Sequence, residues 1–343
     1  MKIKSFVSFK IYFGLIALLF WNNSQAQLTA ITWDSVTVKS SLVSCGFLDV
    51  IDINNDSKLE IVLSTLMEQG SAANQATTKG AVRIFNGTAS TGIPTTWNES
   101  IVLPTDSNLP FINTPQVYDV DEDGNLDILV QQGFLQTNGG SHQWLKGPNF
   151  TQMFAFTPET KKGASNFFWH ESCQWDLDGD GKKDIITTCA NNTVTPVAKK
   201  IEWYRHSGNG QFTKYTICDS LGGVFIKLYD IDGDQDMDIV VSQFFGPPAK
   251  PSIVWLEQLA KPSASNSWLG QWAYHKIDHT TGLGYHMEFF DINGDGNVEL
   301  VYGNHNNLNN TSIVDGNGNA IQSGLYYRSE EHTSELQSRS DLV

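Results

Sequence analysis

Oxygen-bearing side chains recur along the chain in a fixed nine-residue pattern, with Asp, Asn or Glu at positions 1, 3, 5 and 9. Together with the backbone carbonyl at position 7, they suit a hard cation such as Ca²⁺, which takes about six to eight oxygen ligands. The pattern occurs five times, numbered here as loops 1 to 5: Asp52, Asn54, Asp56 and Glu60; Asp119, Asp121, Asp123 and Asp127; Asp176, Asp178, Asp180 and Asp184; Asp230, Asp232, Asp234 and Asp238; Asp291, Asn293, Asp295 and Glu299. The sequence therefore predicts up to five calcium ions, with a structural role.

Position 6 of each loop is where the chain must turn sharply, so we expect a left-handed backbone there. Glycine adopts this conformation freely, and Gly124, Gly181 and Gly296 occupy the position in loops 2, 3 and 5. Ser57 and Gln235 replace glycine in loops 1 and 4, at a cost of about 1 kcal/mol. We therefore expect loops 1 and 4 to be the weaker or more distorted ones.

An EF-hand loop begins with the same spacing of acids, but it needs a bidentate Glu at position 12 and flanking helices. Position 12 offers no carboxylate here, being Leu63, Val130, Thr187, Val241 and Tyr302. Apolar segments rich in β-branched residues follow every loop, and similar segments precede three loops, at residues 47–51, 226–229 and 287–290. Each loop is therefore predicted to be the tip of a β-hairpin.

The loops recur at intervals of 54 to 67 residues, the length of a four-stranded unit. Every repeat has a third apolar segment, at residues 82–85, 143–145, 201–204, 253–256 and 325–327. Most repeats have a fourth, seen at residues 97–102, 212–217 and 272–277. Four short strands per repeat, without helical periodicity, predict an all-β fold: a β-propeller with one four-stranded blade per repeat.

Residues 45–327 resemble the FG-GAP/VCBS repeat family, whose blades carry D-x-D-x-D-G-x-x-D loops, as in integrin α-subunit propellers and in secreted bacterial proteins of this type. The segment from Ile201 to Phe212, with its Trp-Tyr pair and its Gly-Asn-Gly turn, is similar to that family's third and fourth strands. The resemblance implies a calcium-loaded propeller. The Asn and Glu ligands of loops 1 and 5 and the missing glycines of loops 1 and 4 depart from the pattern.

Both ends of the chain are expected to lie outside this domain. Residues 1–26 have the features of a secretory signal peptide: lysines, then an apolar run over residues 11–21, then a small-residue cleavage site at 24–26. The run is too short for a membrane span, although a short N-terminal anchor is the alternative. Residues 328–343 resemble the translation of a short-read sequencing adapter, with a genuine hydrophilic tail as the alternative. We expect a secreted, periplasmic or cell-surface protein.

The domain at residues 27–327 is therefore expected to be an incomplete propeller of five repeats, truncated at the C-terminus, with its fifth repeat unfinished. Residues 31–38 are similar to the fourth strand of a repeat but have no preceding strands to join. They are expected to complete the last blade of a ring of six to eight blades, because pairing the two ends of the chain leaves no open edge.

The chain is acidic, with a formal net charge of −15, and 20 of its 37 acidic residues lie in the five loops. Five bound Ca²⁺ ions would offset much of this charge, and no basic stripe indicates nucleic-acid binding. Four cysteines are too few for a disulfide scaffold. A bridge between Cys173 and Cys189, across the third hairpin, and free buried thiols are both open.

No nucleophile elbow, zinc-protease helix or phosphate loop is present, and the clustered carboxylates are better explained as calcium ligands. Six residues are candidates to line the central funnel, although each also suits a structural role: His142, Trp144, Trp169, His170, His286 and His305. Two functions follow: an extracellular binding or adhesion module for a protein or glycan, or a polysaccharide lyase or other carbohydrate-active enzyme. His, Arg or Tyr converging at the funnel would favour the enzyme.

Overall fold

The computed structural model describes residues 35–71, 74–88, 92, 94–134, 139–245, 252–278, 283–305 and 324–328. The chain divides into two units, Met1–Val36 and Thr37–Val343, and only residues 35 and 36 of the first are described. The expected signal peptide and the tail beyond residue 328 lie outside the described residues. The described part of the second unit is all β, apart from three short 3₁₀ helices: η1 (Thr105–Ser107), η2 (Pro158–Thr160) and η3 (Ala264–Asn266).

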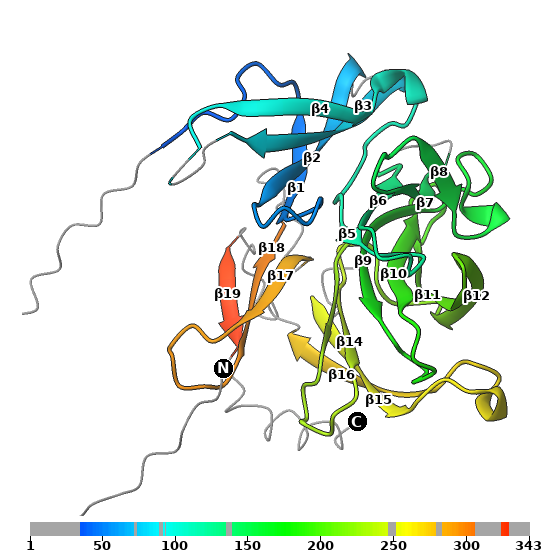
Figure 1. Cartoon of the computed structure of the whole chain (residues 1–343). Helices are drawn as coiled ribbons and strands as arrows, with labels where there is room; N and C mark the ends of the chain where they lie inside the picture. Colours follow the sequence, from blue (N-terminus) through cyan, green and yellow to red (C-terminus); the bar gives the residue numbers. More distant parts are fainter. Residues whose placement is uncertain are drawn as a thin grey trace, which may run out of the picture. The chain divides into compact units, whose positions relative to one another are not determined.

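In the described ranges, nineteen strands form five antiparallel sheets, the blades of a β-propeller (Figure 1). Within each blade the strands pair in chain order. Blade 1 contains β1 (Cys45–Ile51), β2 (Glu60–Ser71), β3 (Asn74–Gly87) and β4 (Trp97–Leu103); blade 2 contains β5 (Val117–Tyr118), β6 (Asp127–Gln132), β7 (Ser141–Lys146) and β8 (Gln152–Ala155); blade 3 contains β9 (Phe168–Trp175), β10 (Asp184–Asn191), β11 (Ala198–Gly208) and β12 (Gln211–Cys218). Blade 4 contains β13 (Ile226–Tyr229), β14 (Asp238–Ser242), β15 (Ile253–Ala260) and β16 (Gln271–Asp278); blade 5 contains β17 (Gly284–Phe290), β18 (Glu299–Asn304) and β19 (Leu325–Arg328).

The propeller of four-stranded blades is thus confirmed, with blade 5 showing three strands among the described residues. Apart from the expected closing strand, the apolar segments predicted as strands all lie in strands. The bounds of β5, β8 and β9 were not predicted; β5 and β8 have only two and four residues, which give too little pattern to detect. Of the expected closing strand, residues 31–34 lie outside the described part, and residues 35–38 are not in a strand.

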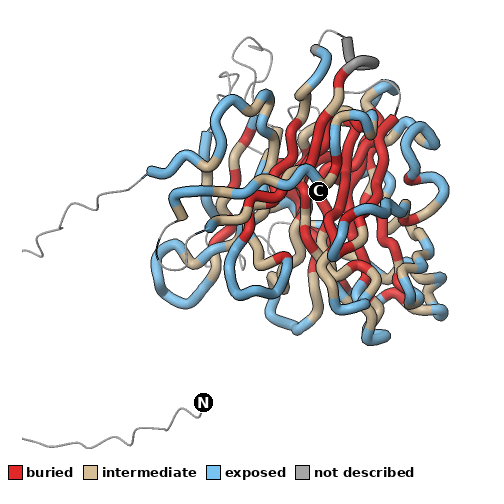
Figure 2. The backbone as a smooth tube through the Cα atoms, turned by 45° about the horizontal axis from the view of Figure 1, so that its top comes forward, coloured by how far each residue is buried: buried red, intermediate tan, exposed pale blue. Residues whose placement is uncertain are grey.

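Burial changes from strand to strand within a blade. Every residue of β6, β10 and β14, the second strands of blades 2 to 4, is buried (Figure 2). In contrast, β8 and β12, the fourth strands of blades 2 and 3, are exposed or only partly buried along their length. A strand that is buried on both faces lies between neighbouring blades, so the main core of this propeller is the set of layers between blades.

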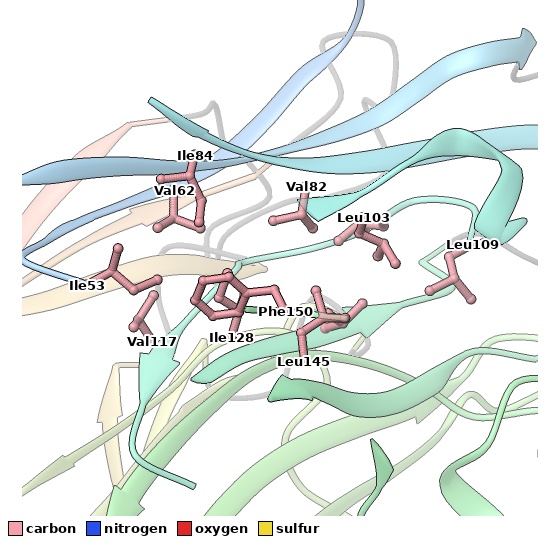
Figure 3. Close-up of a cluster of buried hydrophobic side chains, with 12 residues drawn as sticks. Ile53, Val62, Val82, Ile84, Leu103, Leu109, Val117, Ile128, Leu145 and Phe150 are labelled. Atoms are coloured by element: carbon pink, nitrogen blue, oxygen red, sulfur yellow. The ribbon is translucent and has the colours of Figure 1, made fainter. Parts of the chain in front are cut away.

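Four clusters of buried side chains fill these layers. Between blades 1 and 2, Val62 and Ile84 lie across from Ile128 and Leu145 (Figure 3). Further clusters join blades 2 and 3, 3 and 4, and 4 and 5. Full burial of one aliphatic side chain of this size contributes about 1.5–3 kcal/mol, so each layer is a substantial source of stability.

The proposed Cys173–Cys189 bridge is wrong, because all four cysteines are free. The register of β9 against β10 explains why. Cys173 lies opposite Ile186, while Cys189 lies opposite Trp169. The two cysteines are therefore offset by about 10 Å along the strands, and a disulfide needs Cα atoms about 4–7 Å apart.

Candidate metal centres

Each loop joins the first and second strands of its blade, and its carboxylates are held by its own backbone. The position-1 carboxylate accepts the N–H of position 6 at 2.8–3.0 Å in all five loops. The position-5 carboxylate accepts the N–H of position 7 at 2.8–3.0 Å in all five. These bonds fix the direction of the side chains, so the five copies share one loop conformation.

The position-9 carboxylate connects the loop to the rest of the blade. In every loop it accepts the N–H of position 2, at 2.8–3.1 Å. In loops 2, 3 and 4 the second oxygen of this carboxylate accepts another backbone N–H. The donor is Gly147, just after β7, at 2.7 Å in loop 2, His206 in β11 at 2.8 Å in loop 3, and Gln258 in β15 at 2.8 Å in loop 4. Burial raises the pKa of Asp184 to about 7 and those of Asp127 and Asp238 to about 6, despite these bonds.

The left-handed backbone expected at position 6 is present in all five loops, with φ of +67° at Ser57 and +77° at Gln235. Position 4 is also left-handed in every loop, which the sequence analysis missed. Asn55 (φ +59°) and Glu122 (φ +56°) adopt this conformation without being glycine. Glycines at position 4 of loops 3, 4 and 5 were the available signal. Loop 1 therefore has two non-glycine residues in left-handed backbone, whereas loops 3 and 5 have none.

Three loops bring carboxylate oxygens close enough to share a cation. In loops 2 and 3, oxygens from positions 1, 3 and 9 lie within 4.8 Å of one another, and in loop 4 those of positions 1, 3 and 5 do. Opposite ligands of a Ca²⁺ ion lie about 5 Å apart, so these oxygens fit calcium. No other three Asp, Glu, His or Cys side chains in the described part of the chain bring their ligand atoms within 4.8 Å of one another. Loops 1 and 5 have Asn at position 3 and form no such trio of carboxylates.

Basic side chains from the third strand reach two of these trios. Lys146 Nζ contacts Asp121 and lies 2.6 Å from Asp123. Burial alone would lower the pKa of Lys146, but its hydrogen bonds to the two carboxylates outweigh that effect and raise it. In loop 3, Arg205 donates from Nε to Asp178 at 2.5 Å and from Nη2 to Asp180 at 2.7 Å. Loops 2 and 3 therefore each contain a protein cation.

Three of the predicted ligand-binding residues meet in an aromatic group, called here the inner-strand cluster, composed of Phe47, Phe134, Phe168, His170, Phe225, Phe244, Phe245, Tyr285, His286 and His305. The ring of Phe225 lies 4.6 Å from His170 and 5.0 Å from His286. His305 lies 5.5 Å from Tyr285. Burial lowers the pKa of His170 to about 3, so that imidazole is neutral, whereas His286 and His305 are exposed.

The other three predicted residues do not join the inner-strand cluster. His142, Trp144 and Trp169 are buried in the layer between blades 2 and 3. The imidazole of His142 lies 4.4 Å from the ring of Phe156, and burial lowers its pKa to about 3. Trp144 stacks on Phe154 at 5.0 Å. The structure places these side chains in packing positions.

A charged group that the sequence analysis missed lies beside the inner-strand cluster. Lys227 Nζ lies 3.3 Å from Glu171 and 2.7 Å from Glu288, and Glu288 lies 3.5 Å from His286 Nε2. Glu171 is buried, and burial raises its pKa to about 7 even though Lys227 and the N–H of Ile226 lower it. These residues come from β9, β13 and β17. Only the packing of three first strands brings them together, so no local motif could have identified them.

Comparison with known proteins finds a family similarity for part of the chain. Residues 176–241, which span loops 3 and 4, match the family model described as FG-GAP-like repeat. No curated protein matches the chain. None of the helices in the described ranges has the length and apolar character needed to cross a membrane. Residues 176–241 are thus similar to an FG-GAP-like repeat, and the five-bladed fold that contains them is consistent with an FG-GAP-like propeller.

Proposed function

We propose that this chain is a secreted, calcium-binding β-propeller that acts as an extracellular binding module for a protein or glycan ligand. The observation that carries the proposal is the pattern of backbone N–H bonds to the loop carboxylates, shared by all five loops, together with the close approach of three carboxylate oxygens in loops 2, 3 and 4. The FG-GAP-like repeat at residues 176–241 and the signal-like segment at residues 1–26 support it.

Calcium would be held by the side chains at positions 1, 3, 5 and 9 of each loop, the residues named above, and would supply positive charge to crowded carboxylates. The raised pKa of Asp184, about 7, shows how poorly this carboxylate tolerates its charge without such an ion. Because position 9 also bonds the third strand in blades 2 to 4, neutralising it supports the whole blade rather than the loop alone. The ion is therefore proposed to stabilise structure and not to take part in chemistry.

The exposed edge of the inner-strand cluster is the proposed ligand surface. His286 and His305 are exposed there beside the partly buried Tyr285. Aromatic and imidazole rings at such an edge offer flat apolar faces with polar tips, which suits stacking against sugars or against protein side chains. This keeps two of the six sequence candidates, His286 and His305, at the proposed surface, with His170 buried in the same cluster.

A polysaccharide lyase or other carbohydrate-active enzyme is the second candidate. It is favoured by the chain of contacts from His286 to Glu288, from Glu288 to Lys227 and from Lys227 to Glu171, since all four side chains can donate or accept protons. Because Glu171 has a pKa near 7, it is suited to general acid–base work. Incubation with acidic and neutral polysaccharides, monitored by reducing ends and by absorbance of unsaturated products, separates the two functions. Turnover abolished by His286→Ala would establish the enzyme.

Thermal unfolding of the chain in Ca²⁺ and in chelator tests the calcium part of the proposal. An ion present at about 100 times its Kd adds about 2.7 kcal/mol of stability per site, so several sites should shift the unfolding midpoint by many degrees. Mg²⁺ at the same concentration is the control, since it prefers smaller octahedral sites. An unchanged midpoint would refute calcium binding.

Binding to a glycan array and to extracellular matrix proteins tests the ligand surface. The double variant His305→Ala, Tyr285→Ala should lose binding while keeping the calcium-dependent unfolding midpoint. Tyr274→Ala is the matched control, because Tyr274 is an exposed aromatic residue on β16, away from the inner strands. Equal binding by all three proteins would place the ligand elsewhere.

A further inference from the structure

The loops differ most in the third-strand residue that lies opposite position 9. In blade 1 it is Asn86, which pairs with Glu60. The pairs Ile128–Leu145 and Ile185–Tyr204 place Lys146 and Arg205 opposite Asp127 and Asp184 in blades 2 and 3. The pair Ile239–Leu256 places Glu257 opposite Asp238 in blade 4. The same position therefore holds a neutral residue in blade 1, a cation in blades 2 and 3, and an anion in blade 4.

The two cations are built into their loops. Lys146 bridges the carboxylates at positions 3 and 5 of loop 2, and Arg205 bridges those of loop 3. The side chain of Asp178 is only 2% exposed, so its bond to Arg205 is shielded from water. The guanidinium of Arg205 also lies 4.3 Å from the ring of Trp268, which contributes to holding it over the loop.

Loop 4 has the opposite arrangement. None of its carboxylates forms an ion pair with Lys or Arg in the described chain, and Asp236 at position 7 adds a further acid. Glu257, opposite Asp238, adds another carboxylate beside the loop, and its one ion-pair partner in the described chain is His275, whose Nε2 lies 2.5 Å away. The negative charge around loop 4 is thus larger and less compensated than around loops 2 and 3.

We propose that the third-strand residue opposite position 9 sets the calcium affinity of each blade: Lys146 and Arg205 compete with calcium for loops 2 and 3, and Glu257 strengthens loop 4. This rests on the proposed calcium binding. Calcium affinity rises with the negative charge of the ligand set, and a fixed cation beside the ligands opposes a second one. Loop 4 then binds more tightly than loop 3, the reverse of the order expected from glycine at position 6.

Lys146 and Arg205 should also affect the stability of the protein, in a way that depends on whether calcium is bound. Without calcium, Lys146 and Arg205 neutralise part of their loops and so keep blades 2 and 3 folded. With calcium bound, each becomes a repulsive charge. Removing either one should therefore have opposite effects on stability in the absence and in the presence of calcium.

Calcium titration by calorimetry on the metal-stripped full chain tests the proposal, with Lys146→Gln, Arg205→Gln and Glu257→Gln. The first two should each tighten one site by roughly tenfold or more, and the third should weaken one site several-fold. Lys200→Gln is the matched control, since Lys200 lies on the third strand of blade 3 but contacts Phe167 and no loop. Adding Asp119→Asn to Lys146→Gln should abolish the gain, which assigns it to loop 2.

Unfolding midpoints provide the second readout. Lys146→Gln and Arg205→Gln should unfold at lower temperature than the parent chain in chelator and at higher temperature in saturating calcium. Arg205→Lys keeps the charge but not the two-carboxylate bridge, so its midpoints should lie between those of the parent and of Arg205→Gln in both conditions. Affinities and midpoints unchanged from the Lys200→Gln control would overturn the proposal while leaving calcium binding intact. If neither the parent nor any variant binds calcium, calcium binding itself fails.

Discussion

The carboxylate of Asp184 accepts the backbone N–H of His206 at 2.8 Å, which links the third loop to strand β11 across 22 residues of sequence. Its other oxygen accepts the N–H of Leu177 at 3.1 Å. Asp184 is fully buried, so water cannot replace either bond. This residue is therefore a structural part of its blade as well as a candidate calcium ligand.

Replacing Asp184 with Ala should destabilise the chain even in chelator. Two buried N–H groups lose their acceptor, at a cost of about 1–3 kcal/mol each. Asp176→Ala is the matched variant, because the N–H groups that Asp176 accepts belong to exposed residues that water can satisfy. Urea unfolding in chelator should show a loss of several kcal/mol for Asp184→Ala and about 1 kcal/mol or less for Asp176→Ala. Equal losses would contradict the structural role of Asp184.

Asp178→Ala should destabilise more than Asn54→Ala. The sequence suggests this order because loop 3 has a full set of carboxylates and glycine at position 6. The structure adds that Asp178 is nearly buried and that its loss leaves Arg205 Nε without its acceptor. The difference is expected to be about 1–3 kcal/mol by urea unfolding in calcium. A larger loss for Asn54→Ala would reverse the assigned importance of the two loops.

Glycine at position 6 of loop 4 should stabilise the protein. Gln235 has φ of +77°, which costs a side-chain-bearing residue about 1 kcal/mol, so Gln235→Gly should gain up to about that amount. Gly124→Ala is the reverse control: its φ is +90° and a Cβ there would meet no atom within 4 Å, so its cost is purely conformational. Thermal unfolding should move the two midpoints in opposite directions, and a drop for Gln235→Gly would show that its side chain has another role.

Glu171 should make stability fall as pH rises. Burial raises the pKa of Glu171 to about 7 from an ordinary value of 4.5, so the folded chain binds this proton more tightly than the unfolded chain. The resulting stabilisation is fully present below about pH 4.5 and is lost as pH rises through about 7, a change on the order of 3 kcal/mol. The unfolding free energy of the parent chain minus that of Glu171→Gln should therefore decrease over this range in saturating calcium.

Two buried histidines also change the unfolding free energy with pH, so the effect of Glu171 must be measured as the difference between the parent chain and Glu171→Gln. His142 and His170 have pKa values lowered to about 3 by burial, so they cost stability as pH falls below about 6.5, opposing Glu171. Both are present in parent and variant, and their contributions cancel. A difference that stays constant with pH would show that Glu171 is ionised throughout, held by Lys227.

The layer between blades 1 and 2 should be sensitive to truncation. Ile128 is fully buried in the cluster of Figure 3, and Ile128→Ala should cost about 2–5 kcal/mol through lost burial and the cavity left behind. Ile101→Ala on β4 removes the same atoms from a residue that is 51% exposed and should change stability by about 0.5 kcal/mol or less. Similar losses in both variants would mean that the layer relaxes around the cavity.

The sequence predicts the loops and most strands well because both are local. The nine residues from Asp230 to Asp238 contain the whole pattern that predicts the turn of loop 4. The apolar segment predicted at residues 226–229 has the same bounds as β13 in the structure. What the sequence does not reveal depends on contacts between distant residues. Arg205 reaches Asp178 only because β10 and β11 pair in one register.

The six predicted funnel residues fall into two groups for a similar reason. His142 and His170 both lie on strands with alternating side chains, and alternation assigns a residue to a face without saying what covers that face. In blade 2 the face of His142 is covered by blade 3, whereas His170 points toward the first strands of other blades. Only the packing of the blades distinguishes the two positions.

The continuous burial of β6, β10 and β14 determines how this protein should open to solvent. Amide hydrogens in these strands are shielded on both faces and should exchange last, whereas those of the outer strands β8 and β12 should exchange through local fraying. Asp127, Asp184 and Asp238 each accept a backbone hydrogen bond from a residue of their own blade. Under the proposed calcium binding, loss of the ion from one loop should therefore first expose the outer strands of that blade, while the buried second strands keep their protection through the layers between blades.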